Sequence, residues 1–253
     1  MRGGDRRRPG GDALRERLGW RWHVPAAGPS GEDGVTLDVD AYLADRGDAV
    51  ARILALLEAT AGRAPRLGCF GLHEWAMVYR SQPDDRRHER WPLRLGRDAT
   101  DAVVARSGVR CTHFDAFRFF TDAARPLNEQ PLDRAGQVDV EQPGCLHATM
   151  DLYKWAYKLG PAAPSNLTAD CFLLAREVRE LDMRASPYDL RALGLEPVAI
   201  ETADGRADYV SRQRAFTERG QVLRARLIEV CRELLQDVGD RLPSPADRAP
   251  SPS

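Results

Sequence analysis

The sequence predicts a mainly α-helical protein with a minor β component, organised as a single domain. Four segments carry apolar residues at helical spacing, whereas only three short runs have an extended pattern. A chain of 253 residues with 43% hydrophobic content is long enough to bury one substantial core. We therefore expect a helical domain over about residues 35–240, with a Gly-, Arg- and Pro-rich segment (1–34) before it and a Pro- and Ser-rich tail (241–253) after it, both disordered.

The first predicted helix follows a short extended piece. Residues 35–39 favour a β conformation, and Asp40 is placed to cap a helix that continues to about Glu58. A compact apolar segment follows at 67–80. The polar residues 81–97 then predict a long exposed loop, and loops of that length are often functional or disordered.

Residues 109–120 alternate with a period of two over His113, Asp115 and Phe117, which favours a β-strand but leaves a helix open. That period would place His113 and Asp115 on one side of the strand. A helix here would instead separate the two side chains.

The stretch 141–159 carries the densest set of polar and aromatic groups. A proline–glycine turn precedes good helix formers, so we expect a helix that begins near Cys145, with Glu141 just outside its N-terminus. Within that helix His147 and Asp151 are four residues apart and share a face. The stretch therefore presents an imidazole between two acids.

Two long helices are predicted in the remainder of the chain. Apolar spacing predicts one over residues 165–183 and another over about 206–238. Between them, a serine and a proline mark the start of a short helix over 186–194, and Asp204-Gly205 is typical of a turn.

Composition excludes several classes of protein. The net charge of −1 argues against a wholly basic nucleic-acid-binding protein but leaves room for a local basic face. The five cysteines are widely spaced without a C-x-x-C pair, which indicates buried thiols in a reducing cytoplasm. We expect no membrane contact, because no apolar run approaches the roughly 20 residues that span a bilayer. Phosphate-binding glycine loops and a G-x-S-x-G motif are also absent from the sequence.

Three histidines lie within four residues of a carboxylate in otherwise apolar segments: His73, His113 and His147. Buried imidazoles and carboxylates are costly unless they pair, so ion pairs between helices are one interpretation. Acid–base chemistry without metal is another. A third is a metal site, whose candidate ligands are His73, His113, Asp115, His147 and Asp151.

Four motifs carry a resemblance to a known family: GLHEWAMVYR (71–80), THFDAFRFF (112–120), EQPGCLH with DLYKW (141–155) and LDMRASPYD (181–189). With them the chain resembles a family of actinobacterial proteins commonly labelled 3-methyladenine DNA glycosylase, over roughly residues 35–240. It departs from that family near its start, where a His-Pro-Val-x-Asp-Phe stretch is missing.

The resemblance implies an enzyme that excises alkylated purines from DNA, without a cofactor and without a lyase step. Such chemistry requires a flipped base held between aromatic rings and a carboxylate that stabilises the cationic sugar or activates water. The candidate catalytic residues are Glu141, His147, Asp151 and Asp182. The candidate substrate-binding residues are Trp75, Tyr153, Trp155, Arg184 and Tyr188.

Two alternatives stay open. One is a helical metal-dependent enzyme, an oxygenase or a hydrolase, that uses a divalent transition metal at the histidine and carboxylate residues. The other is a non-catalytic helical binding protein, in which these residues pair with each other.

Overall fold

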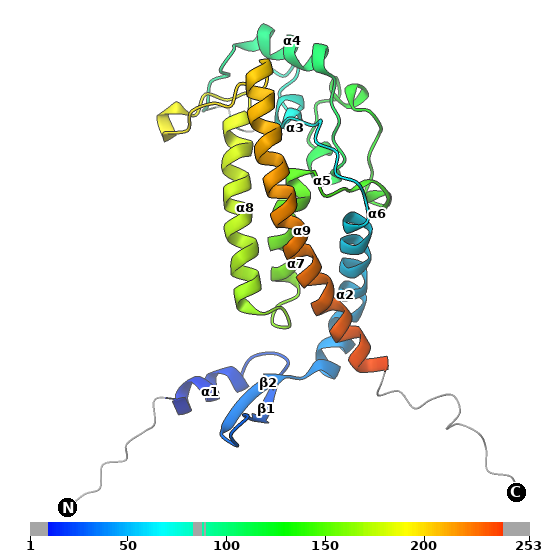
Figure 1. Ribbon diagram of the computed structural model, residues 1–253, viewed down its shortest axis with the longest axis vertical. Helices are drawn as coiled ribbons and strands as arrows, with labels where there is room; N and C mark the ends of the chain where they lie inside the picture. Colours follow the sequence, from blue (N-terminus) through cyan, green and yellow to red (C-terminus); the bar gives the residue numbers. More distant parts are fainter. Residues whose placement is uncertain (1–9, 83–87, 89, 240–253) are drawn as a thin grey trace, which may run out of the picture. The chain divides into compact units, whose positions relative to one another are not determined.

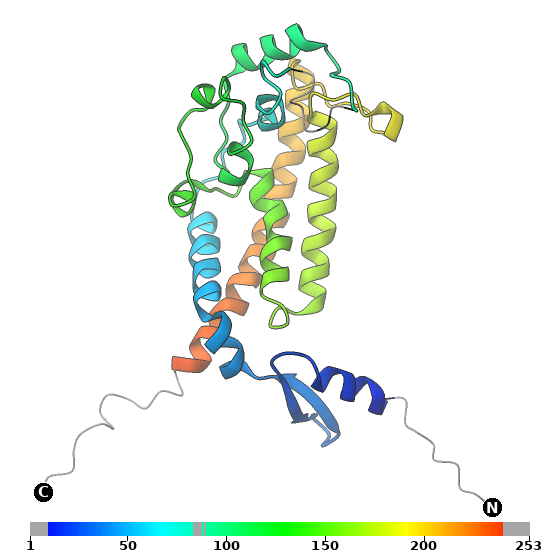
Figure 2. The ribbon, with the colours of Figure 1, turned by 180° about the vertical axis from the view of Figure 1, so that it is seen from behind.

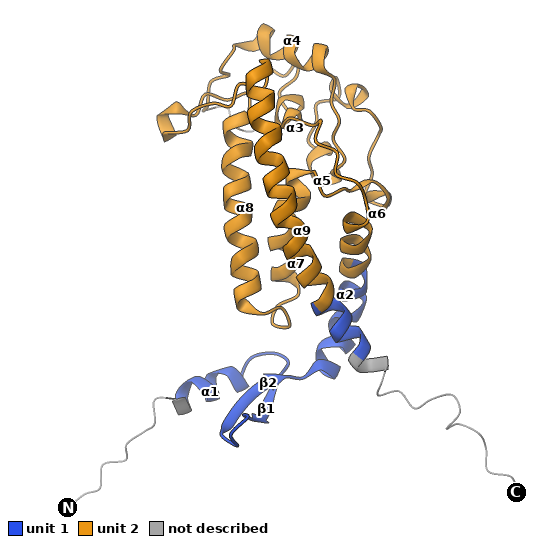
Figure 3. Ribbon diagram, in the orientation of Figure 1, with its two compact units in different colours: residues 1–52, 230–253 blue, residues 53–229 orange. Residues whose placement is uncertain are grey.

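The computed structural model describes residues 10–82, 88 and 90–239 (Figure 1). In this part of the chain the protein is mainly α-helical with one two-stranded sheet, which confirms the predicted fold class. The predicted disorder of residues 1–9 and of the tail 241–253 lies outside the described residues. Residue contacts divide the chain into two compact units, residues 1–52 with 230–253 and residues 53–229 (Figure 3).

The first unit contains a helix and a β-hairpin, largely within residues 1–34, which were expected to be disordered; the end of the second strand falls in the predicted extended piece 35–39. Helix α1 spans Gly10–Leu18, and strands β1 (His23–Ala27) and β2 (Asp33–Leu37) pair antiparallel. The pairing satisfies the backbone polar groups on the edge that the two strands share. The Trp22 ring also packs edge-on against Tyr42, at 5.2 Å between centroids.

Helix α2 spans Val39–Ala61 and begins close to the predicted position. Its N-terminal backbone is capped by Asp38 rather than by Asp40, because the amide of Ala41 donates to Asp38 Oδ1 at 3.0 Å. Asp40 lies inside the first turn, where an acid still complements the helix dipole.

The second unit is built on three long helices that lie side by side (Figures 1 and 2): α7 (Leu146–Lys158), α8 (Ser165–Ala185) and α9 (Ala203–Gly239), of which residues up to 229 belong to this unit. Their start points match the predicted ones to within a few residues. Two ion pairs link α9 to α8, Arg219 to Glu177 at 2.6 Å and Arg226 to Asp170 at 2.8 Å. The facing apolar residues form the core: Leu152, Leu167, Leu174, Val178 and Leu227.

The rest of the second unit includes short helices and turns. They are α3 (Leu72–Ala76), α4 (Arg97–Ser107), α5 (Phe114–Phe117), α6 (Gln137–Val140) and two 3₁₀ turns, Arg125–Leu127 and Arg191–Leu193. Helix α4 was not predicted, because it buries only three residues and is otherwise polar.

Two further segments differ from the patterns that the sequence favours. Residues 109–120 do not form a strand, and the segment contains helix α5, in line with the helical alternative. Only Val109 makes a bridge, to Asn128, and the chain then turns into α5 because the amides of Ala116 and Phe117 bond back to the carbonyl of His113. The predicted helix 186–194 is reduced to a 3₁₀ turn.

The predicted turn at Gly205 is instead the first turn of α9. A glycine is needed there because a Cβ atom would lie 2.0 Å from the carbonyl oxygen of Ala199. The glycine therefore reflects a close backbone approach and not a change of direction.

Candidate metal centre and adjoining cavity

Three polar side chains from three helices meet in the core of the second unit: His73 from α3, His147 from α7 and Asp182 from α8. One ligand atom of each lies within 4.8 Å of the others, a separation compatible with a shared metal ion. The side chains of His73 and Asp182 are 2% and 0% exposed. Such polar groups are costly to bury unless a partner compensates them.

Local sequence explains how His73 reaches this position. Gly71 has a positive φ of 71°, and this left-handed residue turns the chain into the short helix α3. Two residues beyond His73, the indole N–H of Trp75 donates to the carbonyl of Ala185 at 2.8 Å. That bond fastens α3 to the end of α8, less than one turn from Asp182.

His73 and Asp182 form a buried ion pair. Nε2 of His73 lies 2.9 Å from Oδ1 of Asp182. Two ligands about 2.1 Å from one metal ion and about 90° apart would be separated by about 3.0 Å. The observed spacing is compatible with two neighbouring metal ligands as well as with an ion pair in the absence of metal.

The three side chains differ in protonation. Burial lowers the pKa of His147 well below its usual value, and the neighbouring His73 lowers it further, so His147 is neutral. Burial would also lower the pKa of His73, but the Asp182 carboxylate raises it well above the usual value. Burial would raise the pKa of Asp182, but His73 lowers it. Without metal, the cluster is a charged pair beside a neutral imidazole that is ready to act as a ligand.

Asp182 is held from its other side by Arg179, one turn earlier on α8. Nη1 of Arg179 donates to Oδ2 of Asp182 at 2.5 Å and to Oε1 of Glu74 at 3.2 Å. The bond leaves Oδ1 facing the two histidines and fixes the carboxylate orientation, as supporting groups do around metal ligands.

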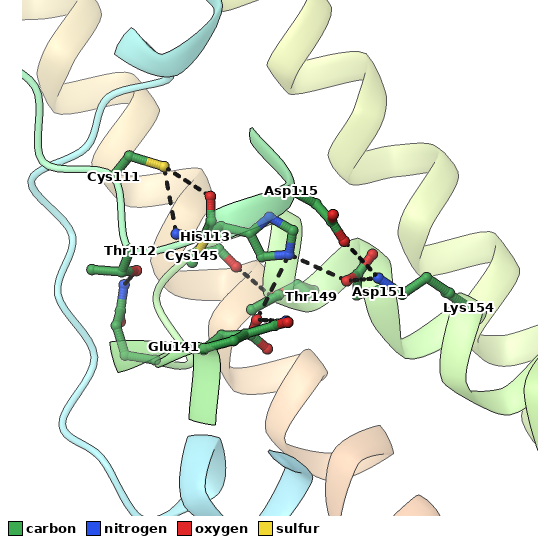
Figure 4. A network of polar contacts seen from close by, with 12 residues as sticks. Cys111, Thr112, His113, Asp115, Glu141, Cys145, Thr149, Asp151 and Lys154 are labelled. Carbon is green, nitrogen blue, oxygen red and sulfur yellow. Dashed lines mark hydrogen bonds and ion pairs between the residues drawn. The ribbon is translucent and has the colours of Figure 1, made fainter. Parts of the chain in front are cut away.

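A second polar network adjoins the cluster (Figure 4). Nε2 of His113 lies 3.2 Å from Oδ2 of Asp151 and 3.7 Å from Oε2 of Glu141. The ammonium of Lys154 bonds to Asp151 and lies 3.4 Å from Asp115. Burial raises the pKa of Glu141, whereas His113 and Lys154 lower that of Asp151 against the effect of burial.

A cavity of about 560 Å³ opens beside both networks. His147 and Asp151 line it from α7, so the shared face predicted for these two residues is the face that meets the cavity. Its other polar and aromatic lining residues include Glu74, Asp115, Arg118, Phe119, Lys154, Arg179 and Tyr188. Of the three clustered side chains, His147 alone is among the lining residues.

The structure brings together most of the predicted metal-site residues but changes the set. His113 and Asp151 lie next to His147 as a separate network, and Asp115 pairs mainly with Arg134, at 2.6 Å. The third residue of the metal cluster is Asp182, which the sequence had suggested only as a catalytic acid. Its signal was an acid at a buried position, four residues after Val178 on the inner stripe of α8.

The predicted substrate-binding residues lie in different places. Tyr188 lines the cavity, whereas Trp75 has no exposed surface and packs in the core. Tyr153 contacts Phe172 at 5.3 Å, and Trp155 lies under the ammonium of Lys154 at 4.3 Å. Arg184 donates to the carbonyl of Glu196. These last four are absent from the cavity lining.

Comparison with protein-family models, with curated proteins and with solved structures finds no match. Among the described helices, none combines the length and the apolar character needed to cross a membrane.

Proposed function

We propose that the protein is a cytoplasmic metal-dependent enzyme that binds one divalent transition-metal ion through His73, His147 and Asp182. The observation that carries this proposal is the convergence of three ligand atoms within 4.8 Å of one another, two of them on side chains that are 2% and 0% exposed. None of the five cysteines forms a disulfide bond, as is usual in a reducing compartment.

Three protein ligands leave coordination positions for water or substrate, and His147 lies at the cavity wall. A metal ion there would lower the pKa of a bound water and so supply a nucleophile at neutral pH. Asp151 lines the same cavity as a carboxylate that can accept a proton. We therefore favour a hydrolase. Two histidines and one carboxylate are also the ligands of non-haem iron oxygenases, so the bound metal distinguishes the two classes.

Metal analysis of the purified protein tests the proposal. We expect about one ion per chain, with zinc indicating a hydrolase and iron an oxygenase. H147A and D182N should each lose the ion, because an incomplete ligand set binds weakly. H23A, which removes a histidine of the first unit, is the control and should keep it. Equal metal content in all four proteins would refute the site.

The resemblance to DNA glycosylases supports a second proposal, base excision without metal. It gains support from the cavity, where the Asp151 carboxylate lies together with the aromatic rings of Phe119 and Tyr188. Release of alkylated purine from damaged duplex DNA in the presence of a chelator, lost in D151N, would establish this activity. Bound metal without base release would exclude it, and the absence of both would leave a non-catalytic binding protein.

A further inference from the structure

A second, smaller cavity adjoins the one beside the proposed metal site. It has a volume of about 170 Å³ and shares Glu74, His88, Arg179 and Tyr188 with the larger cavity. The rest of its wall consists of four apolar side chains, Trp91, Met183, Leu190 and Leu193, together with Arg90 and Ser186. Apolar cavities of roughly 150 Å³ hold a benzene molecule. The smaller cavity therefore fits a phenyl-sized apolar group.

Arg179 lies at the boundary between the two cavities and lines both. Its hydrogen bonds to Asp182 and Glu74 both use Nη1, and 45% of the side chain remains exposed. The other guanidinium N–H groups make no hydrogen bond within the described residues. A guanidinium with free donors in a planar fork matches a carboxylate or a phosphate.

We propose that the substrate is a small organic anion with a phenyl-sized apolar group. The apolar group occupies the smaller cavity, the carboxylate or phosphate binds Arg179, and the reacting part extends into the larger cavity toward His147. This inference rests on the proposed metal-dependent function and specifies the substrate class of that same site.

The geometry also gives Arg179 a second role. Because its Nη1 holds the Asp182 carboxylate, an anion bound to the same guanidinium connects directly to the metal ligand set. The charge of a bound substrate would therefore lie one side chain away from the proposed metal ligand Asp182.

Isothermal titration calorimetry with four probes tests the proposal. Phenylacetate and phenyl phosphate contain both elements, acetate lacks the ring and phenylacetamide lacks the charge. We expect phenylacetate or phenyl phosphate to bind at least about tenfold more tightly than the two incomplete probes, since ring burial and a charge-assisted bond each contribute. The stronger of the two complete probes identifies the anionic group.

Two variants assign the contacts. R179Q should weaken phenylacetate binding about tenfold or more, and M183N should weaken phenylacetate but not acetate. R219Q is the matched control, because Arg219 is also paired with an acid of α8 but does not line either cavity. Equal binding by R179Q and R219Q, or equal binding of phenylacetate and phenylacetamide, would overturn the proposal.

The titrations are repeated on chelator-treated protein, since Arg179 also contacts a proposed metal ligand. If Arg179-dependent binding persists there while metal analysis finds no ion in the untreated protein, the anion site stands and the metal-dependent function fails. If the untreated protein holds the ion but none of the probes binds, the substrate class is wrong and the metal site stands.

Discussion

The imidazole of His113 stacks on that of His147, with ring centroids 5.1 Å apart and 23° between the ring planes. His147 in turn meets His73 edge-on at 4.3 Å. Through this row of three rings the network around Asp151 touches the proposed metal cluster. His113 contacts the proposed ligand His147 but does not belong to the proposed ligand set. Replacement of His113 therefore tests where that set ends.

Replacement of His113 should lower stability without removing metal. The side chain is 1% exposed and lies between the acids Asp151 and Glu141, so H113A leaves two buried carboxylates with less compensation. We expect the free energy of unfolding to fall by about 2–4 kcal/mol, with about one ion per chain retained. Urea unfolding and metal analysis measure the two quantities. Loss of the ion in H113A would show that the ligand set extends to this residue.

The pairing of His73 with Asp182 can be measured by a double-mutant cycle in the presence of a chelator. D182N leaves a buried charged imidazole without its counter-ion, which typically costs about 3–5 kcal/mol, and H73Q leaves the Asp182 carboxylate with Arg179 as its charged partner. The double variant H73Q/D182N should therefore be destabilised by less than the sum of the two. Additive single effects would indicate that the two side chains do not interact in the metal-free protein.

The sequence predicted the long helices well because each carries a continuous apolar stripe. Helices α7, α8 and α9 are amphipathic over several turns, and periodicity is reliable at that length. It was misleading over residues 109–120, where a period of two arose in a segment that is buried in irregular backbone. Of the hairpin at 23–37, only the end of the second strand was predicted, and the first strand was missed because it is short and contains Pro and Ala.

The candidate site was predictable only in part. The shared face of His147 and Asp151 follows from their spacing on one helix, and the cavity lies on that face. The approach of His73 to Asp182 depends on how α3 packs against α8 across 109 residues of chain, and no local pattern encodes that contact. The one indication in the sequence was Asp182 itself, an acid at a buried position of α8.

Replacement of Gly205 by a residue with a side chain should lower the stability of the protein. Because a Cβ there would lie 2.0 Å from Ala199 O, G205A must displace the backbone that enters α9. We expect a loss of about 1–3 kcal/mol. G47A is the control: Gly47 lies inside α2, its nearest neighbour would be 4.0 Å from the new methyl group, and the alanine should stabilise the helix by about 0.5–1 kcal/mol. Thermal unfolding of both variants checks the contrast.

The pair Arg94–Glu201 should make stability depend on pH. Two parallel bonds of 2.5 and 2.8 Å join the side chains, which are only 10% and 16% exposed, and they fasten the loop before α4 to the segment before α9. Burial would raise the pKa of Glu201, but the bonds from Arg94 lower it below the usual value of 4.5. A depressed pKa in the folded state stabilises the protein above the unfolded-state pKa, and that contribution is lost as pH falls through the folded-state value.

E201Q should therefore cost about 3 kcal/mol at pH 7, and its disadvantage should shrink as the pH is lowered below about 4.5. D208N is the control, since the Arg212–Asp208 pair has a similar distance of 2.8 Å but is 43% and 45% exposed. That variant should differ from the parent protein by no more than about 0.5 kcal/mol at any pH. Chemical unfolding between pH 3 and pH 7 provides the measurement. A constant difference between E201Q and the parent protein across this range would mean that Glu201 does not titrate in the folded state as its pairing requires.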